Sequence, residues 1–204
     1  PSVFLQQNSM DLDNIFSCYN SDAVIFLSKN GFVYKMGSSH CEGDLDIYIL
    51  PKANPCPIHI LLRKAIKSLS FHGKHLGVAI SHTGKAYSWG ECDALGTGKS
   101  MCHNPEAIKQ DPIAGDFVQA ATGKNHTLLL TRKGHVYGCG SNEYRQLGEL
   151  DQSDSNHVIF PVSLSKVLFK KFYSLEEENS VHVKLVACGP TCSFIHTNKN
   201  DTFV

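Results

Sequence analysis

Residues 123–140 read GKNHTLLLTRKGHVYGCG, and this stretch decides the fold. The apolar run from Thr127 to Leu130 has the length of a β-strand, and a second apolar run around Val136 follows a polar turn that ends at Gly134. Two short apolar runs joined by a glycine turn are the pattern of a β-hairpin. The stretch therefore predicts a hairpin.

Three further segments align with this stretch without gaps. They read NSDAVIFLSKNGFVYKMG at 20–37, GKHLGVAISHTGKAYSWG at 73–90 and GPTCSFIHTNKNDTFV at 189–204. Each copy begins with Gly or Asn and has Gly or Asn again 11 residues later, at positions 31, 84, 134 and 200. The copies start 53, 50 and 66 residues apart. A period near 50 made of hairpins predicts the four-stranded blades of a β-propeller.

Other repeat folds do not fit the residues. The chain has no Trp-Asp dipeptide of a WD40 blade and no Gly-Gly doublet of a kelch blade. The apolar runs also lack the 3.6-residue period that a helical solenoid requires. The residues therefore exclude a WD40 blade, a kelch blade and a helical solenoid, and the propeller interpretation is kept.

The third copy resembles a full repeat of the regulator of chromosome condensation (RCC1) family, through GKNH at 123–126, KGHVYGCG at 133–140 and RQLG at 145–148. GKAYSWG at 84–90 with Leu95-Gly96 is similar to a second repeat. The first and fourth copies are weaker: Asn20 replaces Gly in the first, and Ala23 and Cys192 stand where the third copy has His126, as Leu76 does in the second copy. The resemblance supports the fold more than a shared binding site.

The resemblance implies an all-β fold: an incomplete β-propeller of about three to four RCC1-like blades, part of a seven-bladed ring. Residues 1–204 are then one propeller segment, with hairpins near 20–37, 73–90, 123–140 and 189–204. The last copy stops inside its hairpin, so we expect the remaining blades to lie outside this chain. A half-ring completed by a partner is the alternative. The insertions at 38–69 and 149–183 are either loops of a binding face or solvated connections.

The repeat also nominates structural residues. The aromatic members (Tyr34, Tyr87 and Tyr137, with Trp89) occupy matching positions of the repeat, or lie near them, and are expected to pack in the core or between blades. His126 is expected to be buried and hydrogen-bonded to a neighbouring loop. The full predicted set is Gly73, Gly84, Tyr87, Trp89, Gly90, Gly96, Gly123, His126, Gly134, Tyr137, Gly140, Leu147, Gly148 and Gly189.

Composition restricts the functional class. Lys+Arg and Asp+Glu both count 19, and this zero net charge argues against nucleic-acid binding and against a polybasic membrane surface. No apolar run reaches the roughly 18 residues that span a bilayer. Eight scattered Cys in a chain of 204 residues indicate reduced thiols. An intracellular location, cytoplasmic or nuclear, is therefore expected.

Catalytic and ligand-binding motifs are weak. GTGKS at 96–100 resembles the tail of a phosphate-binding loop, but Asp93 stands where that motif needs Gly, and Pro105 disfavours the helix that should follow. There is no Cys-x-x-Cys pair for a metal and no Gly-x-Ser-x-Gly nucleophile elbow. We therefore predict no catalytic, cofactor-binding or metal-binding residue and no cofactor.

The predicted function is a non-catalytic protein–protein interaction module belonging to a larger regulatory protein. The resemblance implies a partner such as a small GTPase or a component of the ubiquitin pathway. The alternative is guanine-nucleotide exchange on a small GTPase, the activity best known for the family's namesake.

Overall fold

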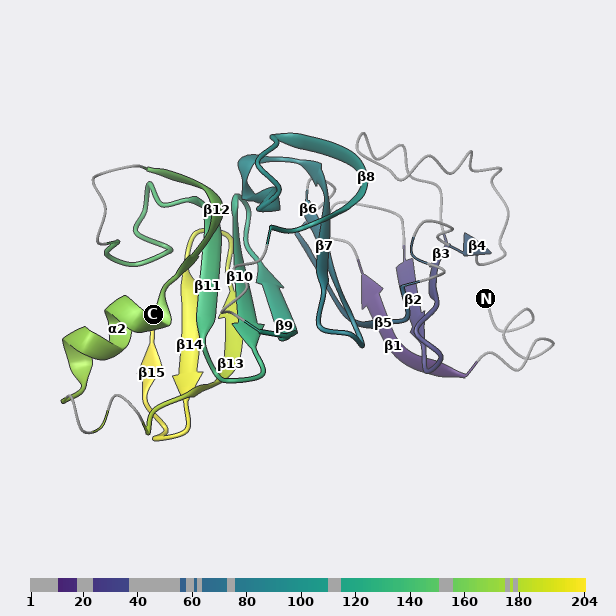
Figure 1. Cartoon of the computed structure of the whole chain (residues 1–204). Helices are drawn as coiled ribbons and strands as arrows, with labels where there is room; N and C mark the ends of the chain where they lie inside the picture. Colours follow the sequence, from purple (N-terminus) through teal and green to yellow (C-terminus); the bar gives the residue numbers. More distant parts are fainter. Residues whose placement is uncertain are drawn as a thin grey trace.

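The computed structural model of the protein describes residues 11–17, 24–36, 56–57, 61, 64–72, 76–109, 115–150, 156–174, 177 and 180–204. These residues form four antiparallel β-sheets (Figure 1). Each sheet is built from strands that follow one another in the chain, so the order of strands in space is their order in sequence. The expected all-β framework is confirmed.

Each sheet is named here as a blade. The first blade holds β1 (Leu12–Ser17), β2 (Val24–Ser28), β3 (Val33–Met36) and β4 (Cys56–Pro57). The second holds β5 (Ile66–His72), β6 (Leu76–Ser81), β7 (Ala86–Glu91) and β8 (Met101–Ala107). The third holds β9 (Phe117–Thr122), β10 (His126–Thr131), β11 (Val136–Ser141) and β12 (His157–Ser163). The fourth holds β13 (Val183–Cys188), β14 (Ser193–Thr197) and β15 (Thr202–Phe203).

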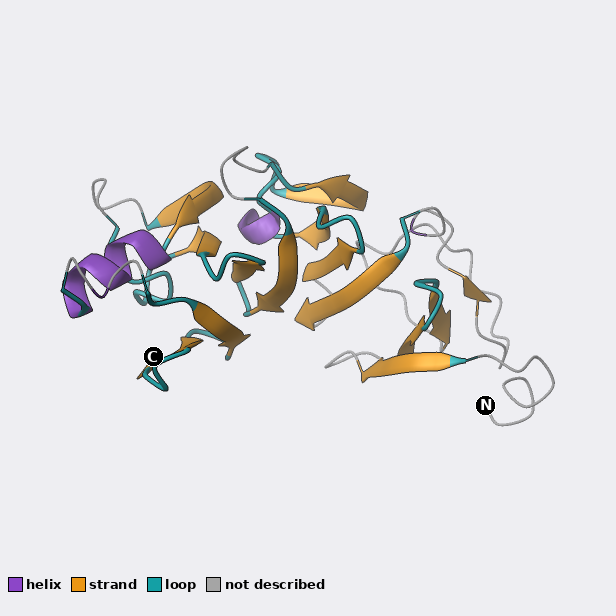
Figure 2. Ribbon diagram, turned by 60° about the horizontal axis from the view of Figure 1, so that its bottom comes forward, coloured by secondary structure: helices purple, strands orange, loops and turns teal. Residues whose placement is uncertain are grey.

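The blades are joined along their first strands. Ser70 of β5 and Thr122 of β9 share a hydrogen bond of 2.9 Å between their hydroxyl oxygens. The Gln119 side chain of β9 donates to the carbonyl of Val186 in β13 at 2.9 Å and accepts from its N–H at 3.2 Å. Figure 2 shows the sheets following one another in a curved row. The expectation of an incomplete β-propeller is confirmed.

The hydrophobic core lies between neighbouring blades rather than inside one of them. Val78 of β6 and Leu129 of β10 belong to one cluster that joins the second and third blades. Leu128 of β10 and Ile195 of β14 belong to another that joins the third and fourth. Because both faces of an inner blade are covered, β6, β10 and β11 are buried at every position, which explains their nearly continuous apolar runs.

The glycine that recurs in the repeat marks the turn of each hairpin. Gly84 and Gly134 have φ angles of 76° and 79°, which L-residues with side chains adopt at a cost. Their carbonyl oxygens accept hydrogen bonds of 3.0 Å from the first residues of the next blade, Phe117 and Val183. A Cβ on Gly134 would lie 2.4 Å from Cβ of His182. The turn therefore joins each blade to the next and leaves no space for a side chain.

The two long insertions contain regular structure where they are described. The strand β12 and the helix α2 (Ser165–Phe172) both lie within 149–183. Within 38–69, the described part comprises β4, Leu61 and residues 64–69, the last of which enter β5. Gly73 of the predicted set and the start of the first repeat copy lie outside the described residues.

Candidate interaction site

Hydroxyl groups at one position of the repeat connect the third and fourth blades to the blade before each. Thr127 Oγ1 of the third blade donates to the carbonyl of Ala94 in the second, at 2.9 Å. Ser193 Oγ of the fourth blade donates to the carbonyl of Gln146 in the third, at 2.6 Å. Thr127 and Ser193 occupy the same position of the repeat, and both acceptors directly precede a Leu-Gly pair. The two junctions therefore share one hydrogen-bonded contact.

His126 belongs to the junction between the third and fourth blades. Its side chain is fully buried, and Nε2 lies 3.1 Å from Ser193 Oγ. Burial lowers the pKa of the imidazole to about 4, so the ring is neutral at physiological pH. Nδ1 has no hydrogen-bond partner among the described residues. The histidine is therefore placed as a packing residue between blades.

The other residues that the sequence nominated are spread along the blades. Trp89 packs edge-to-face against Phe71 with ring centroids 5.6 Å apart, and Tyr137 packs in the same way against Phe117 at 6.2 Å. Lys64 Nζ lies 5.0 Å from the ring centroid of Tyr87. A further group is buried in strands, turns and loops: Gly84, Gly90, Gly96, Gly123, Gly134, Gly140 and Leu147. Gly189 is half-buried. Of the set, only Leu147 and Gly148 border the cleft described next.

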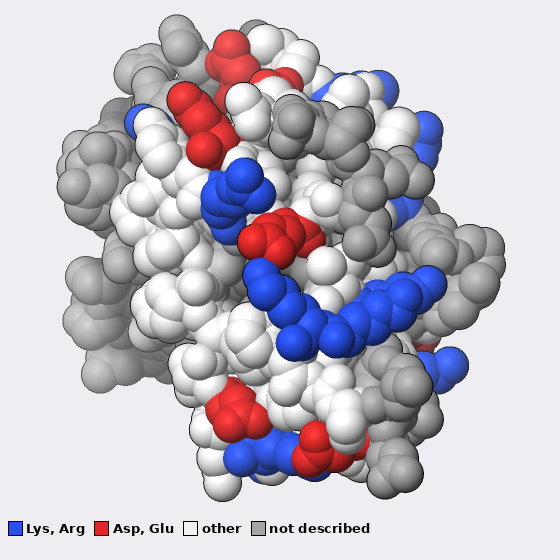
Figure 3. Space-filling view, turned by 90° about the vertical axis from the view of Figure 1, so that its left-hand side faces the viewer, with Lys and Arg blue, Asp and Glu red and all other residues white. Residues whose placement is uncertain are grey.

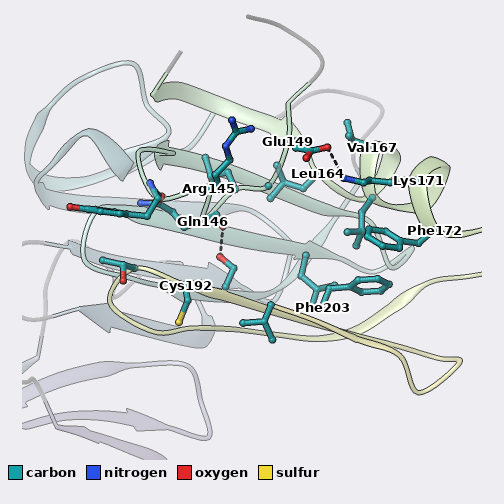
Figure 4. Close-up of a pocket in the computed structure, with 17 residues that line it drawn as sticks. Arg145, Gln146, Glu149, Leu164, Val167, Lys171, Phe172, Cys192 and Phe203 are labelled. Carbon is teal, nitrogen blue, oxygen red and sulfur yellow. Dashed lines mark hydrogen bonds and ion pairs between the residues drawn. The ribbon is translucent and has the colours of Figure 1, made fainter. Parts of the chain in front are cut away.

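A cleft of about 400 Å³ opens between the third and fourth blades (Figure 4). Three segments far apart in the sequence form it: the loop after β11, the helix α2, and the β14–β15 hairpin with the residues around it. Its lining comprises residues 144–149, Leu164, Val167, Leu168, Lys171, Phe172, Thr191, Cys192, Ser193, Ile195, Phe203 and Val204. The volume lies in the range of roughly 300–1,000 Å³ that is usual for ligand pockets.

The helix α2 forms one wall because its sequence is amphipathic. Phe169 is buried, and Val167 and Leu168 are half-buried toward the cleft, while the lysines of the helix face solvent. Phe172 packs against Phe203 of β15 with ring centroids 5.0 Å apart and the rings tilted at 49°. Tyr173 extends this contact, because its hydroxyl donates to Asp201 Oδ2 at 2.5 Å. The helix is therefore fixed to the fourth blade at its C-terminal end.

The loop of residues 141–148 continues the wall that α2 forms and is held by its own hydrogen bonds. Asn142 Oδ1 accepts from the N–H of Leu147 at 2.9 Å, and Asn142 Nδ2 donates to the carbonyl of Gly148 at 3.1 Å. Gln146 Oε1 accepts from the N–H of Tyr144 at 2.9 Å. These bonds leave Tyr144 66% exposed and Arg145 exposed at the mouth of the cleft. The wall is therefore preformed.

The rim of the cleft is basic. Lys166, Lys170 and Lys171 of α2 are exposed, and the helix contains no acidic residue. Lys171 Nζ lies 2.7 Å from Glu149 Oε2, and this hydrogen bond lowers the pKa of the Glu149 carboxyl. Figure 3, which views this end of the molecule, shows Lys and Arg side chains gathered in a band across the face. The apolar cleft thus opens beside a local excess of positive charge.

Chemistry typical of enzymes finds little support at the other candidate positions. The GTGKS segment runs into the strand β8 instead of a helix, and Lys99 binds Glu106 at 2.8 Å, so the segment lacks the geometry of a phosphate-binding loop. Burial raises the pKa of the thiols of Cys92, Cys139 and Cys188 to about 11, about 12 and about 12. These three groups are therefore protonated and weakly nucleophilic at neutral pH.

Two further features are absent from the described residues. No cluster of three or more His, Cys, Asp or Glu side chains suited to a metal ion occurs among them. No helix in the described part of the chain is both long enough and apolar enough to cross a membrane.

The fold and the junctions define a propeller of RCC1-like blades. Family models of the regulator of chromosome condensation (RCC1) repeat match residues 117–146 and 133–195. These matches identify RCC1-like repeats within residues 117–195 of the chain.

Relatives place the repeats in larger proteins. The chain is 33% identical over 126 residues to the protein RCC2 homolog of Danio rerio, covering 61% of this chain and 23% of that protein. It is 34% identical over 100 residues to the E3 ubiquitin-protein ligase HERC2 of Homo sapiens, covering 47% of this chain and 2% of the ligase. The chain therefore spans only a small part of these relatives.

A solved structure shares the fold. Prp20p from Saccharomyces cerevisiae superimposes with a TM-score of 0.72 at 18% identity, covering 95% of this chain and 44% of Prp20p. That structure was described together with the binding of Prp20p to Gsp1p and histones. At this identity the likeness establishes the fold.

The cleft was not among the sequence predictions. The helix α2 had a readable signal, because Leu164, Leu168 and Phe172 recur every four residues as on one face of a helix. No sequence signal indicated that this helix lies beside the 141–148 loop and β15, since these segments meet only through the stacking of two blades.

Proposed function

We propose that this chain is a protein–protein interaction module without catalytic activity, and that the cleft between its third and fourth blades is the docking site for a partner. The observation that carries the proposal is the cleft itself, with a preformed loop on one side, an apolar interior and a basic rim. Exposed Tyr144 and Arg145 at its mouth are of the residue types most enriched at binding hot spots.

The relatives support a regulatory partner. Prp20p binds Gsp1p and histones, and HERC2 is a ubiquitin ligase. We therefore propose a small GTPase or a ubiquitin-pathway protein as the partner class. Five cysteines are free thiols, which supports an intracellular location in the cytoplasm or nucleus: Cys92, Cys102, Cys139, Cys188 and Cys192.

The proposal is tested by immobilising the chain and measuring binding to panels of small GTPases, in nucleotide-free, GDP and GTP states, and of ubiquitin-pathway proteins. Val167→Trp places a large side chain in the cleft, and Lys184→Glu alters an exposed lysine that does not line it. We expect at least one partner to bind wild type and Lys184→Glu equally and Val167→Trp about tenfold more weakly, since 1.4 kcal/mol corresponds to a factor of ten. Absence of binding to every member contradicts the partner class.

The same GTPases, loaded with fluorescent GDP, separate docking from nucleotide exchange. Release at the basal rate in the presence of saturating chain is the result expected of an interaction module. Accelerated release by a GTPase that binds would assign the chain to guanine-nucleotide exchange instead.

A further inference from the structure

We propose that the cleft recognises an acidic, extended peptide segment that inserts one bulky apolar side chain between α2 and the β14–β15 hairpin. This inference rests on the proposed function and names the chemistry of the partner. It follows from three features of the described residues: the length and backbone conformation of one loop, the apolar interior of the cleft and the local charge of its rim.

The loop after β11 differs in length from its counterpart in the second blade. From Gly140 to Gly148 it is two residues longer than the equivalent loop from Gly90 to Gly96 of the second blade. In the second blade this loop forms η2 (Asp93–Leu95), which buries Ala94 and Leu95 completely. In the third blade the longer loop leaves Tyr144 and Arg145 exposed. The extra length therefore goes toward solvent rather than into the core.

Arg145 adopts a backbone conformation that is costly for it. Its φ angle is 60°, in the left-handed region that favours glycine. Its backbone N–H donates to the carbonyl of Asn142 at 3.0 Å and its carbonyl accepts from the N–H of Gly148 at 2.8 Å, so the loop itself holds the residue in this conformation. Backbone strain that the surrounding structure holds in place is concentrated at binding and catalytic sites. The position of the guanidinium at the cleft mouth points to an anionic group on the ligand.

The interior of the cleft favours an apolar group on the ligand. The lining includes the nearly buried side chains of Leu147, Leu164 and Ile195. The tilted ring pair of Phe172 and Phe203 closes one end of the cleft. A bulky apolar side chain that fills this space removes apolar surface from water on both partners. A free phosphate or a sugar would leave the interior unfilled, and so a peptide with a hydrophobic anchor suits the cleft better.

The charge of the rim complements acidic residues beside that anchor. In Figure 4, Arg145, Glu149 and Lys171 lie along the same side of the cleft. Glu149 is already paired with Lys171, while Lys166 and Lys170 continue the positive charge along α2. The whole chain has zero net charge, so this excess is local to the site. Opposite charge at the rim favours encounter with acidic segments and disfavours basic ones.

Fluorescence polarisation of the full chain with fluorescein-labelled peptides tests the inference. The probe has a central Phe flanked by Asp and Glu; one control replaces the Phe with Ala, another replaces the acids with Lys, and a single-stranded oligonucleotide tests simple anion binding. We expect the Ala control to bind about tenfold more weakly than the probe, as loss of a buried aromatic anchor predicts, and the Lys control not to bind. Equal binding of probe and Ala control, or preference for the oligonucleotide, overturns the inference.

Variants locate the peptide. Arg145→Gly removes the guanidinium and relieves the strained backbone, so we expect about tenfold weaker peptide binding together with a higher Tm. Val167→Trp should abolish binding of the Phe peptide, and Lys184→Glu should leave it unchanged. Peptide binding that survives both Arg145→Gly and Val167→Trp contradicts the site.

The two proposals fail differently. If a GTPase or ubiquitin-pathway protein binds in a manner sensitive to Val167→Trp while no acidic peptide does, the cleft docks a partner and the peptide inference is wrong. If the acidic peptide binds at the cleft but no panel member does, the peptide inference stands and the partner class is wrong.

Discussion

The same hydrogen-bonded contact occurs at two junctions, between the second and third blades and between the third and fourth. The surroundings of the contact differ between them. In both, a hydroxyl of the later blade donates to a carbonyl that precedes a Leu-Gly pair of the earlier one. In the first case the intervening loop fills the junction, and Cys139 Sγ also contacts the Ala94 carbonyl at 3.4 Å. In the second the longer loop and α2 border a cleft. The shared hydroxyl contact builds the scaffold, and the longer loop together with α2 builds the site.

The largest expected effect on stability comes from a substitution in the turn that joins two blades. Gly134→Val places a β-branched side chain at φ 79° and 2.4 Å from His182, so we expect a loss of about 3 kcal/mol or more in the free energy of unfolding. Asn200→Val is the matched control, because Asn200 has φ 67° without being a glycine. It should lose about 1–2 kcal/mol, from strain alone. Urea unfolding measures both, and equal losses would show that the turn does not join the blades.

The second prediction concerns acid stability of the cleft junction. Buried His126 has a pKa of about 4, against about 6.5 in the unfolded chain, so the unfolded state binds the extra proton between these values. Stability should be complete above pH 6.5, fall on the order of 3 kcal/mol as the pH drops toward 4, and change no further below that through this group.

Replacing His126 isolates its share of this pH dependence. His126→Leu introduces the residue type found at the equivalent position of the second blade, Leu76, and should flatten the dependence of Tm on pH between 6.5 and 4. His135→Gln, at an exposed histidine, is the control and should leave the profile as in wild type. An unchanged profile in His126→Leu would be incompatible with the buried neutral imidazole.

The sequence predicts the hairpins and their packing, but it does not predict the cleft at the junction between the third and fourth blades. The 11-residue spacing that ends at Gly84 and Gly134 predicts the hairpins, because a positive φ at a close contact demands glycine. The expected burial of Trp89 and Tyr137 is also readable, since apolar strands at matching positions must pack between blades. The cleft is not readable, because Arg145, Val167 and Phe203 come together only when α2 stacks on the fourth blade.

A smaller effect compares the two hydroxyl contacts. Ser193→Ala removes the donor to the Gln146 carbonyl and the partner of His126 Nε2, and we expect a loss of about 1–2 kcal/mol. Thr127→Val removes only the donor to Ala94 and should cost about 1 kcal/mol. Chemical unfolding of the two variants ranks the junctions. A greater loss for Thr127→Val would reverse the ranking that the contacts imply.

The smallest expected effect has the opposite sign. Arg145→Gly relieves a left-handed backbone at an exposed residue and should raise the free energy of unfolding by about 1 kcal/mol. Lys133→Gly, at another exposed basic residue but without a positive φ, should not stabilise the chain. Thermal unfolding of both checks the difference. A loss of stability in Arg145→Gly would mean that the arginine is structural and not retained for binding.

The most direct test of the central claim, that the third–fourth junction is the binding site, is an amide chemical-shift titration of the ¹⁵N-labelled chain with the acidic Phe-containing peptide. We predict shifts confined to residues 144–149, 164–172 and 191–204, with the second-blade loop at 92–98 unchanged. Shifts centred on 92–98, or spread evenly over all blades, would contradict the account.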